Sequence, residues 1–406
     1  MKFAFRCQLW PVIFALLLGL NAAAQTSTPG TLRANVLKPL QAAQEALKNN
    51  QAQQAMALAK EALAIPQLST YEWVSVQRTL AVAAVNAKDH AQATDSLTAL
   101  LGQPDLSPND QRVFLESLIQ ARLQLKDPVG VVKWTQQYLQ AGFTQADMRM
   151  ILLQAWTALN AHAEVVSQVQ TWLQQEAAGG VKTTESELRT LAMSYRQRKD
   201  PVGYEATLLQ LLERYPSKAY WSEAITRQAQ KPNSNPRFEF DMYRLLEETD
   251  NLEDAAEFVE MAELALKAGL PADAQRVIDS GFAKGVLGAG AQGAEQRKLR
   301  QQIQTKTAED LKLLEGLESA AKDGNSWAAV GDARLSHQQW ALAKNAYSKA
   351  LAAGGLRREV EVSLHLAIAL FKSGDAEPAR KLLAAIQGDD TALALANLWR
   401  IRTLAR

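Results

Sequence analysis

The chain has 406 residues, and its 44 basic residues nearly balance its 43 acidic ones. This balance excludes a strongly basic surface of the kind that nucleic acids and anionic membranes attract. A chain of this length exceeds one ordinary core and predicts several domains or an extended array. No zinc-ligand spacing, nucleophile elbow or phosphate-binding loop occurs in it, so we expect no enzyme activity, no cofactor and no metal.

Residues 1–24 are typical of a secretory signal peptide. Two basic residues precede an apolar stretch from Leu9 to Leu20, and Ala22-Ala23-Ala24 forms a small-residue cleavage site. We therefore expect a periplasmic protein that begins at Gln25. The apolar stretch is short for a transmembrane helix, and an uncleaved membrane anchor is the alternative. Cleavage would remove Cys7, the only cysteine, so no disulfide is expected.

Internal repeats follow the signal. The pentapeptide at 126–130, Lys-Asp-Pro-Val-Gly, recurs at 199–203, a separation of about two 36-residue periods. Helical patterns lie on both sides of each copy, and proline suits the first turn of a helix. Each copy is therefore predicted to be the turn inside a helical hairpin. Capping boxes at 69–72 and 184–187 mark two further helix starts.

The stretch from Gly324 shows the repeated unit most clearly. It matches the tetratricopeptide (TPR) template, in which small residues stand where two helices cross closely. The matching residues are Trp327, Gly331, Ala343, Tyr347 and Ala350. Further copies are marked by Ala46, Ala55, Ala59, Ala62 and Pro66, by Phe258, Met261, Ala262, Ala265, Ala274 and Ile278, and by Gly374-Asp375, Ala379 and Leu383. The sequence predicts an all-α, TPR-type α-solenoid, a right-handed superhelix of antiparallel hairpins with about twenty helices; an irregular helical bundle is the alternative.

Two segments interrupt the periodicity of the repeats. The breaker cluster at 231–236 predicts a seam between an amino-terminal array at 25–230 and a carboxy-terminal array at 237–406. The glycine-rich stretch from Gly281 to Gly293 is interpreted as a long surface loop. It contains a G-x-G-x-x-G motif, but a helical pattern precedes it where a dinucleotide site needs a strand, so no nucleotide is expected.

The carboxy-terminal half also carries a resemblance. Asp254-Ala-Ala-Glu-Phe-Val-Glu-Met-Ala through Ser280-Gly-Phe-Ala-Lys-Gly-Val-Leu-Gly is similar to a group of secreted TPR proteins of Gram-negative bacteria. Members of that group are encoded near the TonB, ExbB and ExbD energy-transduction components. The resemblance implies an envelope or TonB-linked context, and it carries over no catalytic or binding residue.

Projection of the helices onto the TPR template places six polar residues on the concave face. They are Arg78, Glu116, Arg189, Arg196, Glu263 and Asp332. Their charges are mixed and do not reproduce the lysine and asparagine clamp by which some TPR domains hold a terminal carboxylate. Arg189 and Arg196 lie two turns apart on one helix, which predicts an acidic or carboxylate-bearing partner segment. Pairing of these arginines with Glu185 or Glu187 is the alternative.

Other polar and aromatic residues have simpler interpretations. Glu253, Glu257 and Glu260 recur at helical spacing in an acidic stretch, and we expect them on a solvated outer face, with a basic partner as the alternative. The four histidines are expected to be solvated turn residues, and most tryptophans are expected in the core. The four are His90, His162, His337 and His365.

Together these patterns predict a periplasmic scaffold that binds a protein or peptide on its concave face. Cell-envelope assembly is one context, and TonB-linked transport is a second that depends on the resemblance alone. A glycan- or peptidoglycan-binding helical module is an alternative, which would need exposed aromatic platforms. The non-catalytic superhelix of a peptidoglycan-processing enzyme is another, but the repeats leave no room for a catalytic domain.

Overall fold

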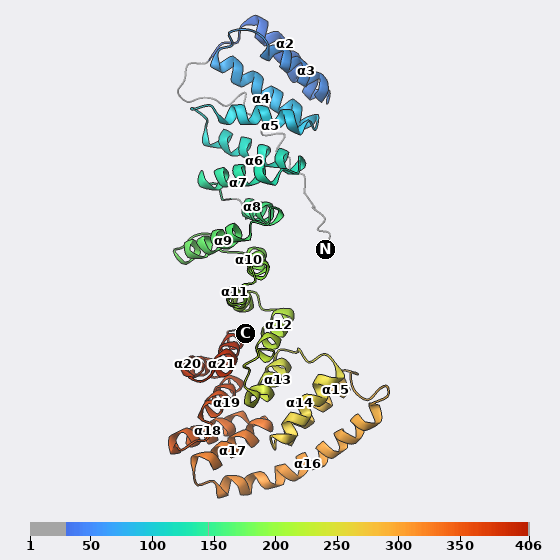
Figure 1. Cartoon of the computed structure of the whole chain (residues 1–406), viewed down its shortest axis with the longest axis vertical. Coiled ribbons are helices and arrows are strands. Elements are labelled where there is room, and N and C mark those ends of the chain that lie inside the picture. The colour runs from blue at the N-terminus through green and yellow to red at the C-terminus, as the bar shows by residue number, and fades with distance from the viewer. Residues whose placement is uncertain (1–29, 145, 405–406) are drawn as a thin grey trace. The chain divides into compact units, whose positions relative to one another are not determined.

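The computed structural model describes residues 30–144 and 146–404. The predicted signal peptide, its cleavage site and Cys7 lie outside these residues. The described residues form twenty α-helices and one short 3-10 helix, with no strand among them (Figure 1). This confirms the expected all-α fold and the expected number of helices. None of the helices in the described ranges combines the length and apolar character needed to cross a membrane.

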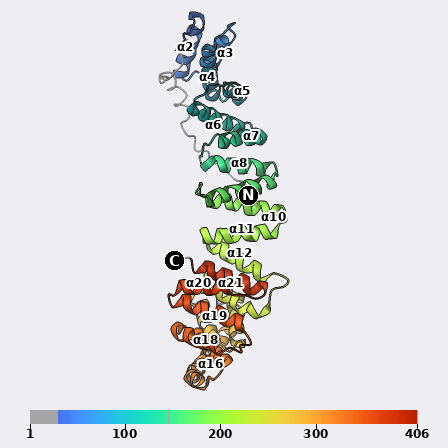
Figure 2. The same cartoon turned by 90° about the vertical axis from the view of Figure 1, so that its left-hand side faces the viewer.

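Two compact units divide the chain, Met1–Asp200 and Pro201–Arg406. The helices of unit 1 are α2 (Ala34–Lys48), α3 (Ala52–Leu63), α4 (Thr70–Asn86), α5 (His90–Leu101), α6 (Pro108–Gln124), α7 (Pro128–Gln140), α8 (Ala146–Ala158), α9 (His162–Ala177) and α10 (Glu185–Gln197). From α2 to α10 each helix packs against its neighbour in sequence, and α2 and α8 also contact the second helix along, α4 and α10 (Figure 2). This is the packing order of TPR hairpins, in which each hairpin covers the apolar face of its neighbour.

Unit 2 contains the remaining helices. They are α11 (Pro201–Arg214), α12 (Lys218–Ala229), η1 (Pro236–Phe238), α13 (Glu239–Glu248), α14 (Ala255–Lys267), α15 (Pro271–Ala283), α16 (Gly293–Ala320), α17 (Gly324–Ser336), α18 (Trp340–Ala353), α19 (Glu359–Lys372), α20 (Ala376–Ala385) and α21 (Asp390–Arg402). Sequential hairpin packing recurs here, so each unit by itself has the packing of a TPR-type α-solenoid.

The repeated pentapeptide forms the predicted hairpin turns. Lys126 and Lys199 adopt left-handed backbone conformations with φ of 53° and 55°, and proline begins the helix that follows each of them, α7 and α11. In the first copy the Asp127 carboxylate accepts a hydrogen bond from the Gly130 amide at 2.9 Å and so caps α7. The two capping boxes are also formed, at the starts of α4 and α10.

The template residues of the α17–α18 hairpin have the close contacts that the TPR pattern requires. Ala343 and Ala350 are completely buried. A Cβ atom on Gly331 would lie 2.5 Å from the ring of Tyr347, so only glycine permits this approach of the two helices. The small residues in the template therefore set the distance between the helices of the hairpin.

Unit 2 also contains contacts between helices that are distant in sequence. Helices α12 and α13 pack against α21 (Figures 1 and 2). Arg402 of α21 pairs with Glu248 of α13 at 2.9 Å and reinforces this packing. Two further ion pairs link the same region to α19: Arg237 with Glu361, and Glu248 with Lys372. Residues as much as 157 positions apart are thus in contact within unit 2.

The breaker cluster at 231–236 lies inside unit 2. Helix α12 ends just before it, at Ala229. Asn235 donates its backbone N–H to Thr391 at 2.9 Å and its side-chain amide to Asp389 at 2.6 Å, and so binds the first turn of α21. The chain divides into its two compact units between Asp200 and Pro201, in the second copy of the pentapeptide.

The expected loop from Gly281 to Gly293 is only partly a loop. Helix α15 continues to Ala283, and Gly281 is a buried helical residue whose Cβ would lie 2.6 Å from Leu287. Leu287 itself is buried in the core of α14 and α15. The prediction of a surface loop was wrong for this part, because a leucine within the glycine-rich stretch returns to the core.

Candidate functional site

Two of the predicted site residues in unit 1 hold helices together. Arg78 of α4 donates to Asp110 of α6 at 2.7 Å and lies over the ring of Phe114. Glu116 of α6 accepts hydrogen bonds from Arg112 at 2.9 Å and from the Tyr138 hydroxyl of α7 at 3.1 Å. Their polar groups are therefore already engaged within the repeats.

Arg189 and Arg196 lie on the exposed face of α10. Met193, 43% exposed, lies between them at helical spacing. Neither arginine forms an ion pair with another described residue. The suggested pairing with Glu187 is wrong, because that carboxylate is buried and contacts Arg149 of α8 at 2.8 Å. The structure thus leaves two cations and one thioether exposed on a single helix face.

The two predicted site residues in unit 2 have contrasting positions. Glu263 is exposed on α14. The Asp332 carboxylate of α17 instead lies in a polar network, where it accepts the Tyr347 hydroxyl at 2.7 Å and faces Nδ1 of His365 at 2.8 Å. Burial opposes its ionisation, but these two hydrogen bonds lower the pKa of Asp332 below its usual range.

His365 of α19 occupies the centre of this network. It is 7% exposed, so its expectation as a solvated turn residue was wrong. Its Nε2 lies 2.9 Å from Asp241 of α13 and 3.3 Å from Arg244, and its Nδ1 faces Asp332. Burial lowers the pKa of His365, but the two carboxylates outweigh that effect and raise it to about 9. The imidazole is therefore a cation at neutral pH.

Arg244 links this histidine to a second group of charges on α13 and α15. Its guanidinium contacts Asp273 at 2.7 Å and Asp241 at 3.2 Å. Arg276 contacts the other oxygen of Asp273 at 2.5 Å and both oxygens of Glu247. Burial alone would destabilise these charges, so the pairing must offset the cost of removing them from water.

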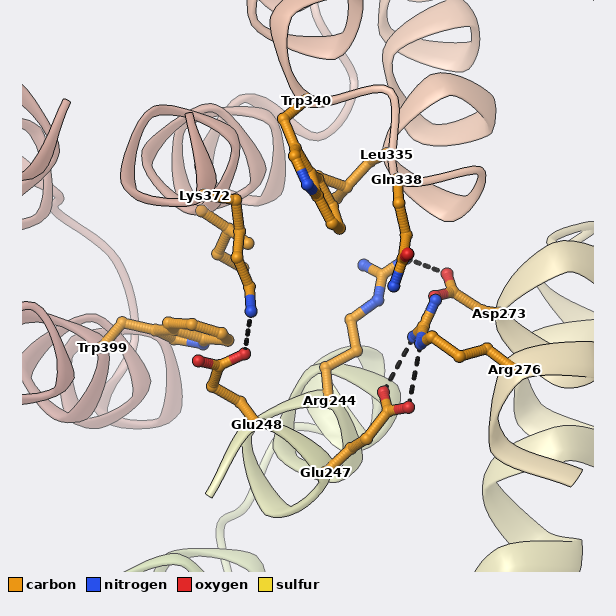
Figure 3. A pocket seen from close by; sticks show the side chains of 11 residues that line it. Arg244, Glu247, Glu248, Asp273, Arg276, Leu335, Gln338, Trp340, Lys372 and Trp399 are labelled. Atoms are coloured by element: carbon orange, nitrogen blue, oxygen red, sulfur yellow. Dashed lines mark hydrogen bonds and ion pairs between the residues drawn. The ribbon is translucent and has the colours of Figure 1, made fainter. Parts of the chain in front are cut away.

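A cavity of about 360 Å³ opens beside this group, entirely within unit 2. Arg244, Glu247 and Glu248 reach it from α13, and Asp273 and Arg276 reach it from α15 (Figure 3). Its remaining lining residues are Leu335, Gln338, Trp340, Ile368, Lys372 and Trp399. Six of these eleven residues are charged, and four are apolar or aromatic, so the cavity is more polar than most ligand pockets but offers both charged and apolar contacts.

The acidic stretch was only partly interpreted correctly from the sequence. Glu253 is 70% exposed, as expected of a solvated residue. Glu257 accepts the backbone N–H groups of Glu253 and Asp254, and Glu260 accepts the Tyr243 hydroxyl at 2.6 Å. The three glutamates therefore do not form a free stripe.

Three other carboxylates of the same stretch turn inward to cations of unit 2. They are Asp241, Glu247 and Glu248. A weak signal for this existed in the sequence, since Asp241, Arg244 and Glu247 or Glu248 recur every three to four residues and so share one helix face.

Within the described residues, no group of three histidine, aspartate or glutamate side chains is arranged to hold a metal ion. Most of the tryptophans expected in the core are buried there, whereas Trp73, Trp327 and Trp340 are partly exposed.

Comparison with known proteins gives distant structural likenesses. No family model matches the chain, and no curated protein sequence matches it. The crystal structure of yeast Tom70 is similar, with 12% identity over 91% of this chain and 95% of that chain, at a TM-score of 0.25. The structure of Naa15/Naa10 bound to HypK is also similar, with 15% identity and a TM-score of 0.32. That alignment covers 95% of this chain, which spans only 63% of the matched chain.

Proposed function

We propose that this chain is a non-catalytic scaffold that binds an acidic segment of a protein or peptide on the exposed face of α10. The observation that carries the proposal is the row of Arg189, Met193 and Arg196 on that face. Both guanidinium groups are available to carboxylates, and a thioether between them adapts to varied apolar side chains. A hairpin scaffold provides such faces at regular intervals, so several weak contacts add up along one partner.

The cellular context is part of the same proposal. The signal-peptide pattern at 1–24 supports export to the periplasm. The resemblance of the carboxy-terminal half to secreted TPR proteins supports a role in envelope assembly or TonB-linked transport. Amino-terminal sequencing of the exported protein tests the first point: we expect a start at Gln25, and a start at Met1 would contradict cleavage.

Charge reversal on α10 tests the binding face. The probe is a fluorescein-labelled hexaglutamate peptide, with binding measured by fluorescence anisotropy at low salt. Exposed ion pairs contribute up to about 1 kcal/mol each, so Arg189→Glu combined with Arg196→Glu, which also adds repulsion, should weaken binding about ten-fold. Circular dichroism should show unchanged helicity, because both side chains are exposed.

A matched variant separates this face from a general loss of positive charge. Lys38→Glu combined with Lys60→Glu makes the same charge change at exposed positions on α2 and α3 of the same unit. We expect this variant to bind the probe as the wild type does. Equal losses in both double variants would contradict a specific site on α10. Partners recovered by cross-linking should likewise be lost only from the α10 variant.

A glycan-binding module is disfavoured by the tryptophans. A sugar platform needs exposed aromatic faces. Five of the eight tryptophans after residue 24 are buried, at 7% exposure or less: Trp134, Trp156, Trp172, Trp221 and Trp399.

A further inference from the structure

The α13 and α15 side of the cavity has carboxylates whose oxygens are already occupied. Glu247 accepts Nε and Nη2 of Arg276 at 2.9 and 2.8 Å. Asp273 faces Arg244 with one oxygen, at 2.7 Å, and Arg276 with the other, at 2.5 Å. Both oxygens of Glu247 and both oxygens of Asp273 therefore have a cationic partner.

Cations from α19 and α21 pair with the third carboxylate, Glu248 of α13, in the same way. One oxygen of Glu248 contacts the Lys372 ammonium, and the other contacts Arg402 at 2.9 Å. All three carboxylates that line the cavity therefore have both oxygens paired. A ligand cation would have to compete with an existing partner for any of them.

The cations retain donor capacity. Lys372 has three N–H bonds, but among the described residues it contacts only the Glu248 carboxylate. Nη1 of Arg276 has only a long contact, 3.5 Å, to the Ser336 carbonyl. Both cations are also more exposed than the carboxylates behind them: Lys372 is 30% exposed and Glu248 11%, while Arg276 is 27% exposed and Asp273 3%. The unused hydrogen-bonding capacity of the cavity thus favours a ligand that supplies acceptors.

The apolar walls lie next to one of these donors. Lys372 lies between Trp340 of α18 and Trp399 of α21, opposite Arg244 (Figure 3). Its ammonium is 5.9 Å from the ring centroid of Trp340. Leu335 and Ile368 complete the apolar lining. An acceptor held by Lys372 would therefore have its apolar substituent against an indole ring.

We propose that this cavity binds a small organic acid with an apolar, aromatic body. Its carboxylate contacts the Lys372 ammonium, its ring packs against Trp340, and any second acceptor lies within reach of Arg276 or Gln338. The volume of about 360 Å³ is near the lower end for small-molecule pockets, which fits a free acid of amino-acid size. This site is independent of the face proposed on α10.

Isothermal titration calorimetry of the full chain tests the proposal with N-acetyl-L-phenylalanine and with its carboxamide. The two compounds differ only in the charged acceptor, so the acid should bind at least about ten-fold more tightly. Lys372→Met should weaken binding of the acid about ten-fold. The substitution leaves Glu248 paired with Arg402, so the fold should be retained.

Lys344→Met is the matched control. Lys344 has nearly the same exposure, 31%, and pairs with Asp375 outside the cavity, so binding should be unchanged. If Lys372→Met does not fold, Trp340→Ala provides a second variant, and it should also lose binding of the acid. The proposal is overturned by no binding of the acid at about 10 mM, by equal affinity for the carboxamide, or by equal loss in the Lys344 variant. It is also overturned when a longer peptide ending in phenylalanine binds and the free acid does not.

Discussion

The two units use the same helical hairpin but stabilise it by different contacts. In unit 1 each helix packs mainly on its sequence neighbours, and ion pairs such as Arg78 with Asp110 are partly exposed, although the pair of Arg149 with Glu187 is buried. In unit 2, α12 and α13 also pack on α21, and Arg244, Asp241 and His365 are buried together. A repeat array gains stability from each nearest-neighbour interface. In unit 2 the contacts of α12 and α13 with α21 add to the stability from residues distant in sequence, and this addition depends on ion pairs.

Removal of Arg244 should have the largest effect, and it should be confined to unit 2. The change Arg244→Met leaves Asp241 without one cationic partner and Asp273 with Arg276 alone, in a buried environment. Breaking a buried pair in this way typically costs about 3–5 kcal/mol. Urea unfolding followed by circular dichroism measures the loss. Hydrogen exchange should increase in α13, α15 and α19 but not in α2 to α10. A loss below about 1 kcal/mol would contradict this role of the pairing.

Alkaline pH should weaken unit 2 through His365. The pKa of this histidine is about 9 in the folded chain and 6.5 in an unfolded chain. Because the folded pKa is the higher, its stabilisation is complete below pH 6.5 and is lost as pH rises through 9. The loss is on the order of 3 kcal/mol, and it should appear as a lower urea midpoint at pH 9.5 than at pH 6. His365→Gln should abolish most of this difference, and an unchanged pH dependence in that variant would assign the effect to another group.

Overpacking a hairpin should have an intermediate effect. Ala350 is completely buried in α18, and its carbonyl would lie 3.0 Å from a Cβ on Gly324. Ala350→Leu should therefore force the helices apart and cost about 1–3 kcal/mol. Differential scanning fluorimetry would show this as a lower melting temperature. Leu342→Ala, at an exposed position of the same helix, is the control and should change stability little.

The local part of the fold could be predicted from the sequence. The hairpin turns at Pro128 and Pro201, the capping boxes and the buried alanines all follow from residues a few positions apart. Such signals are strong because the backbone requirements of helix starts and stops are met by few residue types. The exposed positions of Arg189 and Arg196 also follow from helical periodicity alone.

The cavity could not be predicted, because it depends on contacts that no local pattern encodes. His365 has Asp241 as a neighbour across 124 residues, and Glu248 meets Lys372 at the same separation. The TPR template places Asp332 on a concave face, but it does not indicate that α19 and α13 cover it. The 28-residue helix α16 is likewise absent from the template, and it connects α15 to α17.

The smallest effect is expected from an ion pair of unit 1, and it completes the comparison. Arg78 and Asp110 are 23% and 26% exposed, so water already solvates both groups in part. Arg78→Met should cost at most about 1 kcal/mol, most of which should disappear at high salt. The Arg78 guanidinium also lies over the Phe114 ring, and the methionine replaces this cation–π contact with an apolar one. A double-mutant cycle with Asp110→Asn isolates the pairwise term, which should be several-fold smaller than the term from the corresponding cycle of Arg244→Met with Asp273→Asn. If the two coupling energies were equal, partial exposure would not weaken the pair of unit 1, and the contrast between partly exposed and buried ion pairs in the two units would fail.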